Sequence, residues 1–367
     1  GPLDDDDLLR EILLRLPPQP SSLPRTSLVC KRWRGLVSEP GFYHRFRFHR
    51  RHNPPPILGC LVDLYNQGKR YISFMSTLDP PNRIPAEWFS LHFNHGDPLR
   101  LLGCCHGLVL LFSKTRFEVL VWDPVTGDRH RLAIPPGFYA EGTAITGAMQ
   151  HGEAFACVYS SETGLWGNFI SALLPSDVPT TTCDIQILAS DVGDSLYWLV
   201  NKVFLDNSSS ILELDLNGQS INVIPVPMEE KAALTNCHMC VMRAKGGGLG
   251  FLYLSYFSAQ FWKRKTDCNG VASWQLGRAI ELDKLLSLKI ERKGRPYIIG
   301  FASQNNVVFL WTRVGIFMLQ LDSLQFKKIF EIGILNWPPC YYPYESVYDA
   351  GTGGGQDGAE LLQDAED

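Results

Sequence analysis

Apolar and polar positions follow the period of an α-helix at the start of the chain. Leucine and isoleucine recur at spacings of three and four residues, and arginine and glutamate occupy the positions between them. The apolar positions of this segment are Leu8, Leu9, Ile12, Leu13 and Leu16. Aspartates at positions 4–7 precede them, where carboxylates favour a helix start, and prolines follow from residue 17. The pattern predicts an amphipathic helix that ends before Pro17.

A second helix is predicted between Ser21 and Pro40. Ser21 and Ser22 are candidate caps, Pro24 suits a first helical turn, and Pro40 ends the pattern. The apolar positions of this helix are Leu28, Val29, Trp33, Leu36 and Val37. Two short helices cannot bury this much apolar surface by themselves, so the segment needs a partner or a second domain.

From about residue 57 the helical period gives way to short apolar runs separated by turn residues, which predicts β-strands. Three stretches of the sequence contain the same elements in the same order. Each has an apolar run, a turn, a second apolar run, another turn and a closing run. These stretches are residues 107–135, 194–225 and 307–332. The closing runs of the first two begin 90 residues apart, at positions 131 and 221, which fits two units of roughly 45 residues.

Four-stranded repeats of this length are typical of a β-propeller. We therefore predict an α+β multidomain chain, in which a small helical domain precedes a mainly antiparallel β-propeller of about six blades. Five or seven blades are the alternatives, and an irregular sandwich or a pair of β domains is the competing fold. Less regular segments at 57–95, 144–188 and 237–282 have to supply the remaining blades.

We expect boundaries at residues 3–48 for the helical domain, 49–56 for a linker, 57–349 for the β domain and 350–367 for a tail. The linker contains Asn53-Pro54-Pro55-Pro56, and consecutive prolines favour an extended, semi-rigid spacer. The tail is rich in glycine and acidic residues, so we expect it to be disordered.

The net charge, the apolar runs and the cysteines indicate the compartment in which the protein is expected to function. The chain has 367 residues and a net charge of −4, so neither sign dominates. No apolar run approaches the roughly 20 residues of a membrane span, and no secretory signal is visible. Ten irregularly spaced cysteines then indicate reduced thiols rather than a disulfide framework. We expect a protein of the cytoplasm, the nucleus or both, without a membrane partner.

Candidate metal ligands and nucleophiles do not form complete sites. The Cys-His-Met-Cys run at 237–240 has suitable ligand types but lacks a second pair, and Cys-Cys-His at 104–106 suits a core strand and a turn. A further possible site is His92, His95 and Asp97, which could converge on a metal but lie in an irregular β segment, so we assign no metal to them. Gly-x-Ser-x-Gly and phosphate-loop motifs are absent from the sequence. We predict no metal, no cofactor and no catalytic residue.

Two aromatic segments have alternative interpretations. Residues 44–52, His-Arg-Phe-Arg-Phe-His-Arg-Arg-His, could contact nucleic acid. The slightly acidic chain favours instead a connector in which Phe46 and Phe48 point inward and the arginines point to water. Near the other end, an aromatic group either anchors a target or closes the β domain, and closure is favoured. Its members are Trp337, Tyr341, Tyr342, Tyr344 and Tyr348.

The N-terminal segment resembles an F-box. The resemblance is carried by Leu3, by Leu-Leu-Arg-Glu-Ile-Leu-Leu-Arg-Leu-Pro at 8–17, by Ser-Leu-Val-Cys-Lys-Arg-Trp-Arg at 27–34, and by Pro40, Phe42 and Phe46. It departs from the family at its start, where Asp4 rather than proline follows Leu3. Residues 103–109, 122–127 and 342–348 are similar to the F-box-associated, kelch-like propellers of plant F-box proteins.

This resemblance implies a substrate-recognition subunit of an SCF-type (cullin-RING) ubiquitin ligase, with no catalysis by this chain. It implies docking on a Skp-family adaptor, and through it on cullin and RING subunits, while the propeller presents a target protein. The residues implied for the adaptor contact are Leu3, Leu8, Leu9, Ile12, Leu13, Leu16, Leu28, Val29, Cys30 and Trp33. The sequence names neither the target nor the residues that bind it. A non-degradative interaction protein and a propeller enzyme are the alternatives.

Overall fold

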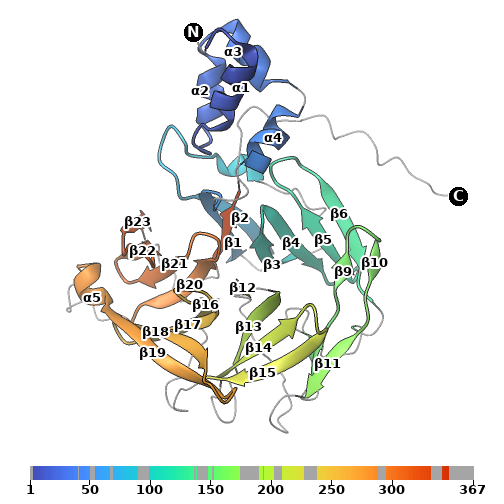
Figure 1. Ribbon diagram of the computed structural model, residues 1–367, viewed down its shortest axis with the longest axis vertical. Coiled ribbons are helices and arrows are strands. Elements are labelled where there is room, and N and C mark those ends of the chain that lie inside the picture. The colour runs from blue at the N-terminus through green and yellow to red at the C-terminus, as the bar shows by residue number, and fades with distance from the viewer. Residues whose placement is uncertain are drawn as a thin grey trace, which may run out of the picture. The chain divides into compact units, whose positions relative to one another are not determined.

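The structure is a computed structural model, and it describes residues 3–39, 41–49, 54–66, 69–89, 99–135, 138, 148–150, 153–173, 190–192, 194–201, 209–226, 238–287, 295–331 and 341–346. A small N-terminal helical domain precedes a mainly antiparallel β domain with a propeller arrangement (Figure 1). The chain divides into two compact units, Gly1–Leu132 with Tyr342–Asp367, and Ala133–Tyr341. None of the helices in these described ranges has the length and apolar character needed to cross a membrane.

The helical domain contains α1 (Asp6–Leu14), α2 (Ser22–Ser27), α3 (Lys31–Val37) and α4 (Phe42–His49). The predicted first helix is confirmed. Asp5 caps it, because its carboxylate accepts hydrogen bonds from the backbone nitrogens of Asp7 at 2.8 Å and Leu8 at 3.1 Å. The run of aspartates thus satisfies donors that a helix start leaves unpaired.

The prediction of one continuous second helix is wrong, because residues 28–30 separate α2 from α3. Cys30 has an extended backbone, with φ −163° and ψ 170°, and its sulfur accepts a hydrogen bond from the Trp33 nitrogen at 3.5 Å. Cys30 therefore starts a new helix rather than continuing the old one. Ser21 occupies the start of α2 but makes no side-chain cap.

Residues 42–49 form a helix, so the predicted strand-like alternation of phenylalanines is wrong. Phe42 and Phe46 are four residues apart, share one face of α4 and are both buried. The side chain of Phe48 lies outside the described residues, as does Pro40.

Side chains from all four helices form one core in the helical domain. Its buried members are Leu9, Leu13, Leu14, Leu23, Leu36, Phe42 and Phe46. Leu16, Trp33 and Val37 are partly buried against it. This small domain has an apolar core of its own, which stabilises its fold.

The described β strands of the first unit form two sheets. One has the order β2-β1-β24, and the other the order β3-β4-β5-β6. Their bounds are β1 (Ile57–Asn66), β2 (Lys69–Ser76), β3 (Leu99–Cys105), β4 (Leu108–Ser113), β5 (Glu118–Trp122), β6 (Arg129–Ala133) and β24 (Tyr341–Glu345), with a 3-10 turn η1 at Ala86–Phe89. The last strand of the β domain therefore joins its first strands.

Tyr344 shows why the aromatic C-terminal segment closes this unit. Its side chain is fully buried, its hydroxyl donates to the backbone oxygen of Gly107 at 2.8 Å, and its ring meets Phe89 edge to face at 5.2 Å. Tyr341 is also buried and Tyr342 is half-buried. The closure interpretation is confirmed for Tyr344, whereas Trp337 and Tyr348 lie outside the described residues.

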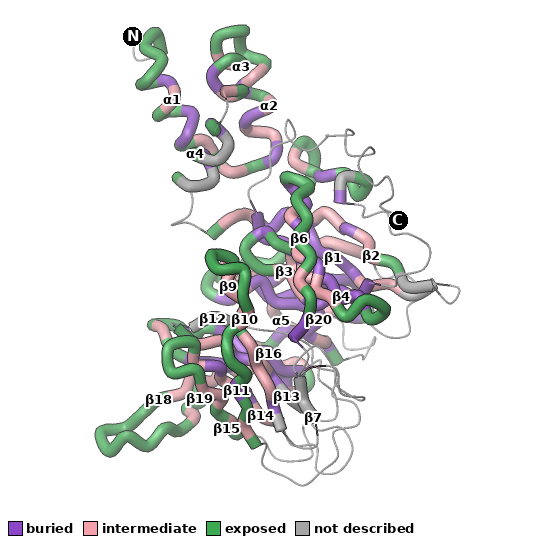
Figure 2. Tube along the Cα trace, turned by 90° about the vertical axis from the view of Figure 1, so that its right-hand side faces the viewer, coloured by how far each residue is buried: buried purple, intermediate pink, exposed green. Residues whose placement is uncertain are grey.

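In the second unit, β12 to β15, β16 to β19 and β20 to β23 form three four-stranded sheets, and smaller sheets have the orders β11-β8-β7 and β10-β9. The first strands are β7 (Ala148–Gln150), β8 (Glu153–Ala156), β9 (Tyr159–Ser160), β10 (Leu165–Trp166), β11 (Ile170–Leu173), β12 (Ser190–Val192), β13 (Ser195–Asn201), β14 (Ser209–Asp215) and β15 (Ser220–Pro225). They are followed by β16 (Met239–Arg243), β17 (Leu249–Ser255), β18 (Ser258–Thr266), β19 (Ala272–Glu281), α5 (Leu282–Leu285), β20 (Tyr297–Ala302), β21 (Val307–Thr312), β22 (Gly315–Gln320) and β23 (Phe326–Phe330). Figure 2 shows the exposed outer end of the β18–β19 hairpin.

The three repeated stretches of the sequence correspond to β4–β6, β13–β15 and β21–β23, in the predicted order. Each is part of a four-stranded antiparallel sheet, so the predicted propeller architecture is confirmed. Five blades are found among the described strands, where about six were predicted. Short apolar runs that alternate with turn residues in the sequence were therefore enough to predict these strands.

Candidate functional site

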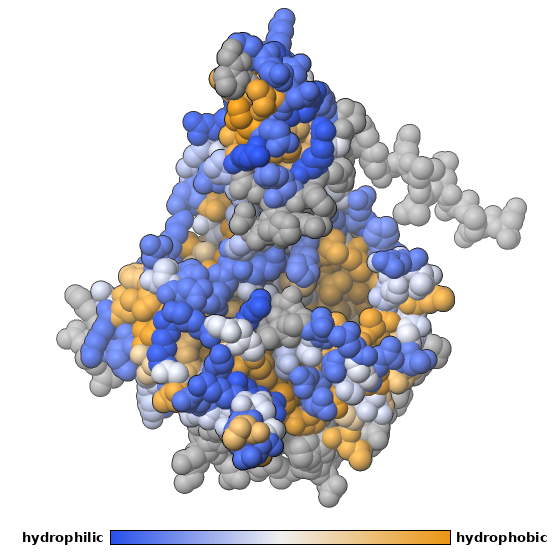
Figure 3. Space-filling model, in the orientation of Figure 1, coloured by the Kyte–Doolittle hydropathy of each residue, from blue (hydrophilic) through white to orange (hydrophobic). Residues whose placement is uncertain are grey.

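An apolar surface remains exposed outside the core of the helical domain. Leu8 and Ile12 are four residues apart on α1 and are 51% and 40% exposed. Leu28 and Val29, between α2 and α3, are 75% and 60% exposed, and Leu3 is 47% exposed. Figure 3 shows the hydrophobic area on this domain. Several large apolar side chains exposed on so small a domain indicate an interaction surface, which we call the apolar surface of the helical domain.

Arg32 brings two parts of this surface to the same end of the domain. Its guanidinium donates to the Asp6 carboxylate at 2.7 Å and to the backbone oxygens of Leu3 at 2.5 Å and Asp4 at 2.7 Å. Arg32 lies near the start of α3, directly after the connection that carries Leu28 and Val29. These hydrogen bonds hold the N-terminal residues against the start of α3, which follows that connection.

A second ion pair joins α1 to the segment before α4. Arg10 donates to both carboxylate oxygens of Glu39, at 3.0 Å and 2.7 Å. This hydrogen-bonded arginine lowers the pKa of Glu39 below its usual range. Arg45 lies 3.6 Å from the same carboxylate. The Arg10–Glu39 pair leaves no local signal in the sequence, because its partners are 29 residues apart.

The residues predicted for adaptor contact fall into two structural classes. Leu9 and Leu13 are fully buried in the core of the helical domain, and Leu16 and Trp33 pack partly buried against it. The exposed class consists of Leu3, Leu8, Ile12, Leu28, Val29 and Cys30. The exposed class is the part that a partner could reach without unfolding the domain.

Within the first unit, the helical domain also contacts the β domain. The side-chain oxygen of Asn82, after β2, accepts from the Ser21 nitrogen at 3.1 Å, and its amide donates to Gln19 at 3.4 Å. The last proline of the predicted linker, Pro56, accepts from the Ser346 nitrogen at 3.2 Å. These contacts tie the turn after α1 and the end of the linker to the β domain. Asn53 lies outside the described residues.

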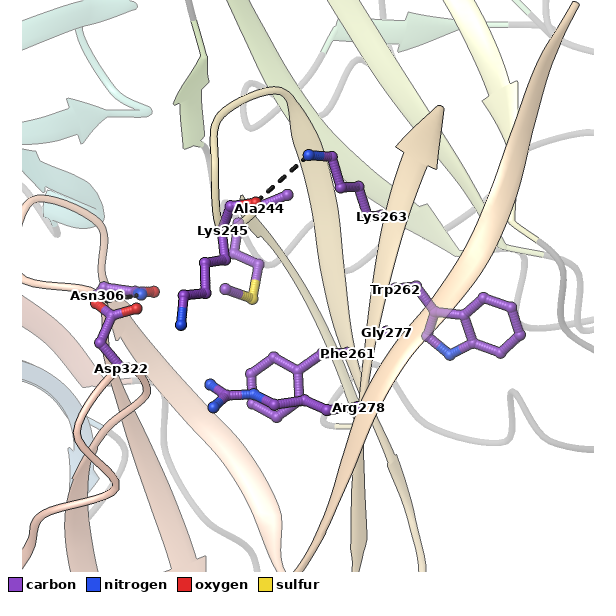
Figure 4. A pocket seen from close by; sticks show the side chains of 10 residues that line it. Ala244, Lys245, Phe261, Trp262, Lys263, Gly277, Arg278, Asn306 and Asp322 are labelled. Atoms are coloured by element: carbon purple, nitrogen blue, oxygen red, sulfur yellow. Dashed lines mark hydrogen bonds between the residues drawn. The ribbon is translucent and has the colours of Figure 1, made fainter. Parts of the chain in front are cut away.

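The second unit contains a pocket of about 250 Å³ between the β16–β19 sheet and the turns of the β20–β23 sheet (Figure 4). Its lining residues are Met242, Ala244, Lys245, Phe261, Trp262, Lys263, Gly277, Arg278, Asn306 and Asp322. Three cationic side chains and one carboxylate thus surround an apolar floor. The pocket leaves no local signal in the sequence, because its residues come from five separate segments of the chain.

The charged groups of the pocket have specific supports. The Arg278 guanidinium lies 4.5 Å from the centre of the Phe261 ring, a cation–π contact, and donates to the backbone oxygen of Leu321. The Asp322 carboxylate accepts from Asn306 at 2.9 Å and from Gln320 at 3.3 Å. In Figure 4, Lys245 and Arg278 extend toward Asn306 and Asp322, while Trp262 extends away.

The candidate metal ligands are dispersed or fall outside the described residues. Cys240 is fully buried in β16, whereas Cys237 lies outside those residues. Cys104 is half-buried against the core of the first unit, Cys105 is exposed and His106 occupies the following turn. The residues named as a further possible site, His92, His95 and Asp97, also lie outside the described residues. Across the described ranges, no group of three or more His, Cys, Asp or Glu residues is placed to hold a metal.

The burial of the cysteines predicts their reactivity. Burial raises the pKa of the Cys240 thiol to about 12 and raises that of Cys60 well above its usual value. Because the thiolate is the reactive form, iodoacetamide at pH 8 is expected to modify exposed Cys30 and Cys268 at least tenfold faster than these two. Peptide mass spectrometry checks this, and denaturant should equalise the four rates. Equal rates in the native protein would contradict the burial of Cys60 and Cys240.

The basic segment predicted as a connector contributes to packing in its described part. Phe46 lies in the helical core, and Arg45 faces Glu39. The side chain of Arg47 and residues 50–53 lie outside the described residues. The described contacts in this segment support a structural role.

Comparisons with known proteins agree with both parts of the fold. Residues 5–45 match the F-box domain profile, and residues 100–336 match the profile described as "F-box protein AT5G49610-like, beta-propeller". The chain is 26% identical over 122 residues to F-box/kelch-repeat protein At3g17530 of Arabidopsis thaliana, covering 33% of this chain and 31% of that protein. It is 27% identical over 217 residues to F-box only protein 8 of the same plant, covering 58% of this chain and 68% of that protein. The match thus spans about a third of the first relative and about two thirds of the second.

Proposed function

Because this chain belongs to the family of F-box proteins with a β-propeller, we propose that it is the substrate receptor of an SCF-type ubiquitin ligase. An F-box joined to a propeller implies a substrate-recognition adaptor. The proposal adds that the helical domain docks on a Skp-family adaptor, and through it on cullin and RING subunits. The observation that carries it is the apolar surface of the helical domain, which stays exposed around a complete core.

The receptor would act by proximity rather than by chemistry of its own. A conjugating enzyme carries ubiquitin as a thioester, and a lysine of the target attacks it. Holding the target beside that thioester replaces a dilute encounter by a high effective concentration. The hydrogen bonds of Asn82 with Gln19 and Ser21 support this role, since they connect the F-box helices to the β domain.

Co-purification with a Skp-family adaptor tests the docking. We expect stoichiometric binding by the intact chain and at least a tenfold loss of affinity in Leu28→Asp, because an aspartate at a buried contact must be desolvated. A tenfold loss corresponds to about 1.4 kcal/mol. The matched control is Leu165→Asp, which makes the same change at a leucine of the β domain that is 67% exposed. Circular dichroism checks that both variants keep their fold.

Two results would count against the docking. One is a folded intact chain that does not bind the adaptor, and the other is an equal loss of binding in Leu28→Asp and Leu165→Asp. If docking is established, a reconstituted ubiquitination reaction with a captured partner decides between a ligase receptor and a non-degradative interaction protein. The receptor is expected to promote ubiquitin transfer to that partner, and Leu28→Asp to abolish the promotion.

A further inference from the structure

We propose that the pocket between the β16–β19 and β20–β23 sheets is the docking site for an acidic, extended segment of the target protein. One carboxylate side chain of that segment would enter the pocket, and neighbouring acidic residues would follow strand β18. The inference rests on the proposed receptor function and names the chemistry of its target.

The pocket carries an excess of positive charge. Its lining contains Lys245, Lys263 and Arg278 but a single carboxylate, Asp322, which already accepts hydrogen bonds from Asn306 and Gln320. Within the part of the chain that the structure describes, Lys263 and Arg278 donate to backbone oxygens, and no ion pair joins any of the three cations to a carboxylate. An anion entering the pocket would therefore gain charge-assisted hydrogen bonds without displacing an existing ion pair.

The cations are presented by well-defined backbone. Lys245 lies in a tight turn in which Gly246, Gly247 and Gly248 have φ of +83°, +89° and +79°, a conformation that suits glycine. The turn is closed by hydrogen bonds of 2.9 Å from Ala244 to Gly248 and from Gly247 to Ala244. Lys263 donates to the Lys245 backbone oxygen at 3.4 Å. Two backbone hydrogen bonds within the turn and one from the Lys263 side chain thus hold the segment that carries Lys245.

The shape and lining of the pocket suit an acidic side chain. Met242, Ala244 and Phe261 are buried residues that form an apolar floor. Arg278 lies on the Phe261 ring, so its charge is held directly above that floor. Methylene groups of a glutamate would contact the floor while its carboxylate meets the cations. A space of about 250 Å³ accepts a side chain rather than a folded domain.

The positive surface continues along strand β18. Phe261, Lys263 and Lys265 alternate on one face of the strand, and the spacing between such residues is about 6.7 Å. Their partners on β19 are Arg278, Gln275 and Ser273, so none of the three is paired with an acidic residue on that strand. An extended peptide places alternate side chains at the same spacing. Acidic residues at every second position would thus match the lysines.

Nucleic acid is the alternative polyanion, and the aromatic residues of the pocket disfavour it. Single strands bind by stacking bases on accessible aromatic faces. The Trp262 ring instead stacks on Phe251, with 5.8 Å between ring centres, and extends away from the pocket (Figure 4). The Phe261 ring is occupied by Arg278. An acidic peptide therefore fits better than a nucleic acid.

Fluorescence anisotropy on the full chain tests the proposal. The probe is a labelled dodecapeptide with glutamate at alternate positions and glycine or alanine between them, and the comparison peptide has glutamine in place of glutamate. We expect the glutamate peptide to bind at least tenfold more tightly, and Lys245→Glu to weaken it at least tenfold. The matched control is Lys114→Glu, an exposed lysine in the turn after β4 with the same change of charge. Circular dichroism and a thermal melt check the fold of both variants.

The outcomes separate the alternatives. Equal binding of the two peptides, or equal weakening by Lys245→Glu and Lys114→Glu, overturns the proposal. If a single-stranded oligonucleotide binds more tightly than the glutamate peptide, and its binding depends on Lys245, the proposal is overturned in favour of a nucleic-acid site. Tighter binding of a phosphoserine version of the peptide, lost in Lys245→Glu, supports the anion site with a phosphorylated target as its source.

The same samples distinguish a failure of the pocket from a failure of the receptor function. Adaptor binding without glutamate-peptide binding removes the acidic docking site and leaves the ligase assignment in place. Peptide binding that depends on Lys245 but occurs without adaptor binding supports the site and removes the ligase assignment.

Discussion

Replacing Leu9 by alanine is expected to destabilise the helical domain by about 2–5 kcal/mol, the usual cost of truncating a buried leucine. Leu9 is fully buried in a core shared by all four helices. A domain this small has a low free energy of unfolding. We therefore expect the helical domain to be unfolded in a large fraction of the Leu9→Ala molecules. Hydrogen exchange measured by mass spectrometry on peptides covering α1 and α4 reports the opening of these helices.

Ile12→Ala is the control, because Ile12 lies on the same helix but is 40% exposed. Ile12→Ala should lower the free energy of opening measured by hydrogen exchange by less than about 1 kcal/mol. It should nevertheless weaken adaptor binding. Leu9→Ala should weaken binding only in proportion to the unfolded fraction. Equal loss of protection in the two variants would contradict the division between a buried class and an exposed class of F-box residues.

Replacing Tyr344 by alanine is expected to lower the free energy of unfolding of the β domain by about 3–5 kcal/mol, as for other large aromatic truncations. The substitution removes a fully buried ring, its edge-to-face contact with Phe89 and its hydrogen bond to Gly107. It also weakens the attachment of β24 to β1. Urea denaturation followed by tryptophan fluorescence measures the change.

Two variants show which part of Tyr344 matters. Tyr344→Phe keeps the ring and leaves the buried Gly107 oxygen without its donor, so it should cost about 1–3 kcal/mol. Tyr71→Ala truncates a tyrosine of β2 that is 45% exposed, and its effect should be below about 1 kcal/mol. If Tyr344→Ala were as mild as Tyr71→Ala, the pairing of β24 with β1 would not hold the domain closed.

The two proposed surfaces assign different tasks to different parts of the chain. The apolar surface of the helical domain suits a constant partner, since exposed leucine and isoleucine side chains gain most from burial in a complementary groove. The cationic pocket suits a target, because charge and spacing select among peptides. Substitutions at Leu28 and Lys245 should therefore affect binding to the adaptor and to the peptide independently.

The sequence by itself determined the elements whose signals are local. The first helix followed from the spacing of its leucines and from the aspartates that cap it at Asp5. Strands β4–β6, β13–β15 and β21–β23 followed from short apolar runs between turns, and their repetition indicated a propeller. Each of these signals depends on residues close together in the chain, so no knowledge of packing was needed.

Only the tertiary structure decided which side chains of those elements are buried and which are exposed. Leu8 and Leu9 are adjacent and equally apolar, yet Leu8 is half exposed and Leu9 is buried, because the packing of α2, α3 and α4 selects one face of α1. The same packing buries Phe42 and Phe46 and makes residues 42–49 a helix, although their alternation suggested an extended connector. The cationic pocket is the extreme case. Lys245, Arg278 and Asp322 meet through strand pairing and sheet packing, and long-range contacts of this kind have no signature in a single sequence.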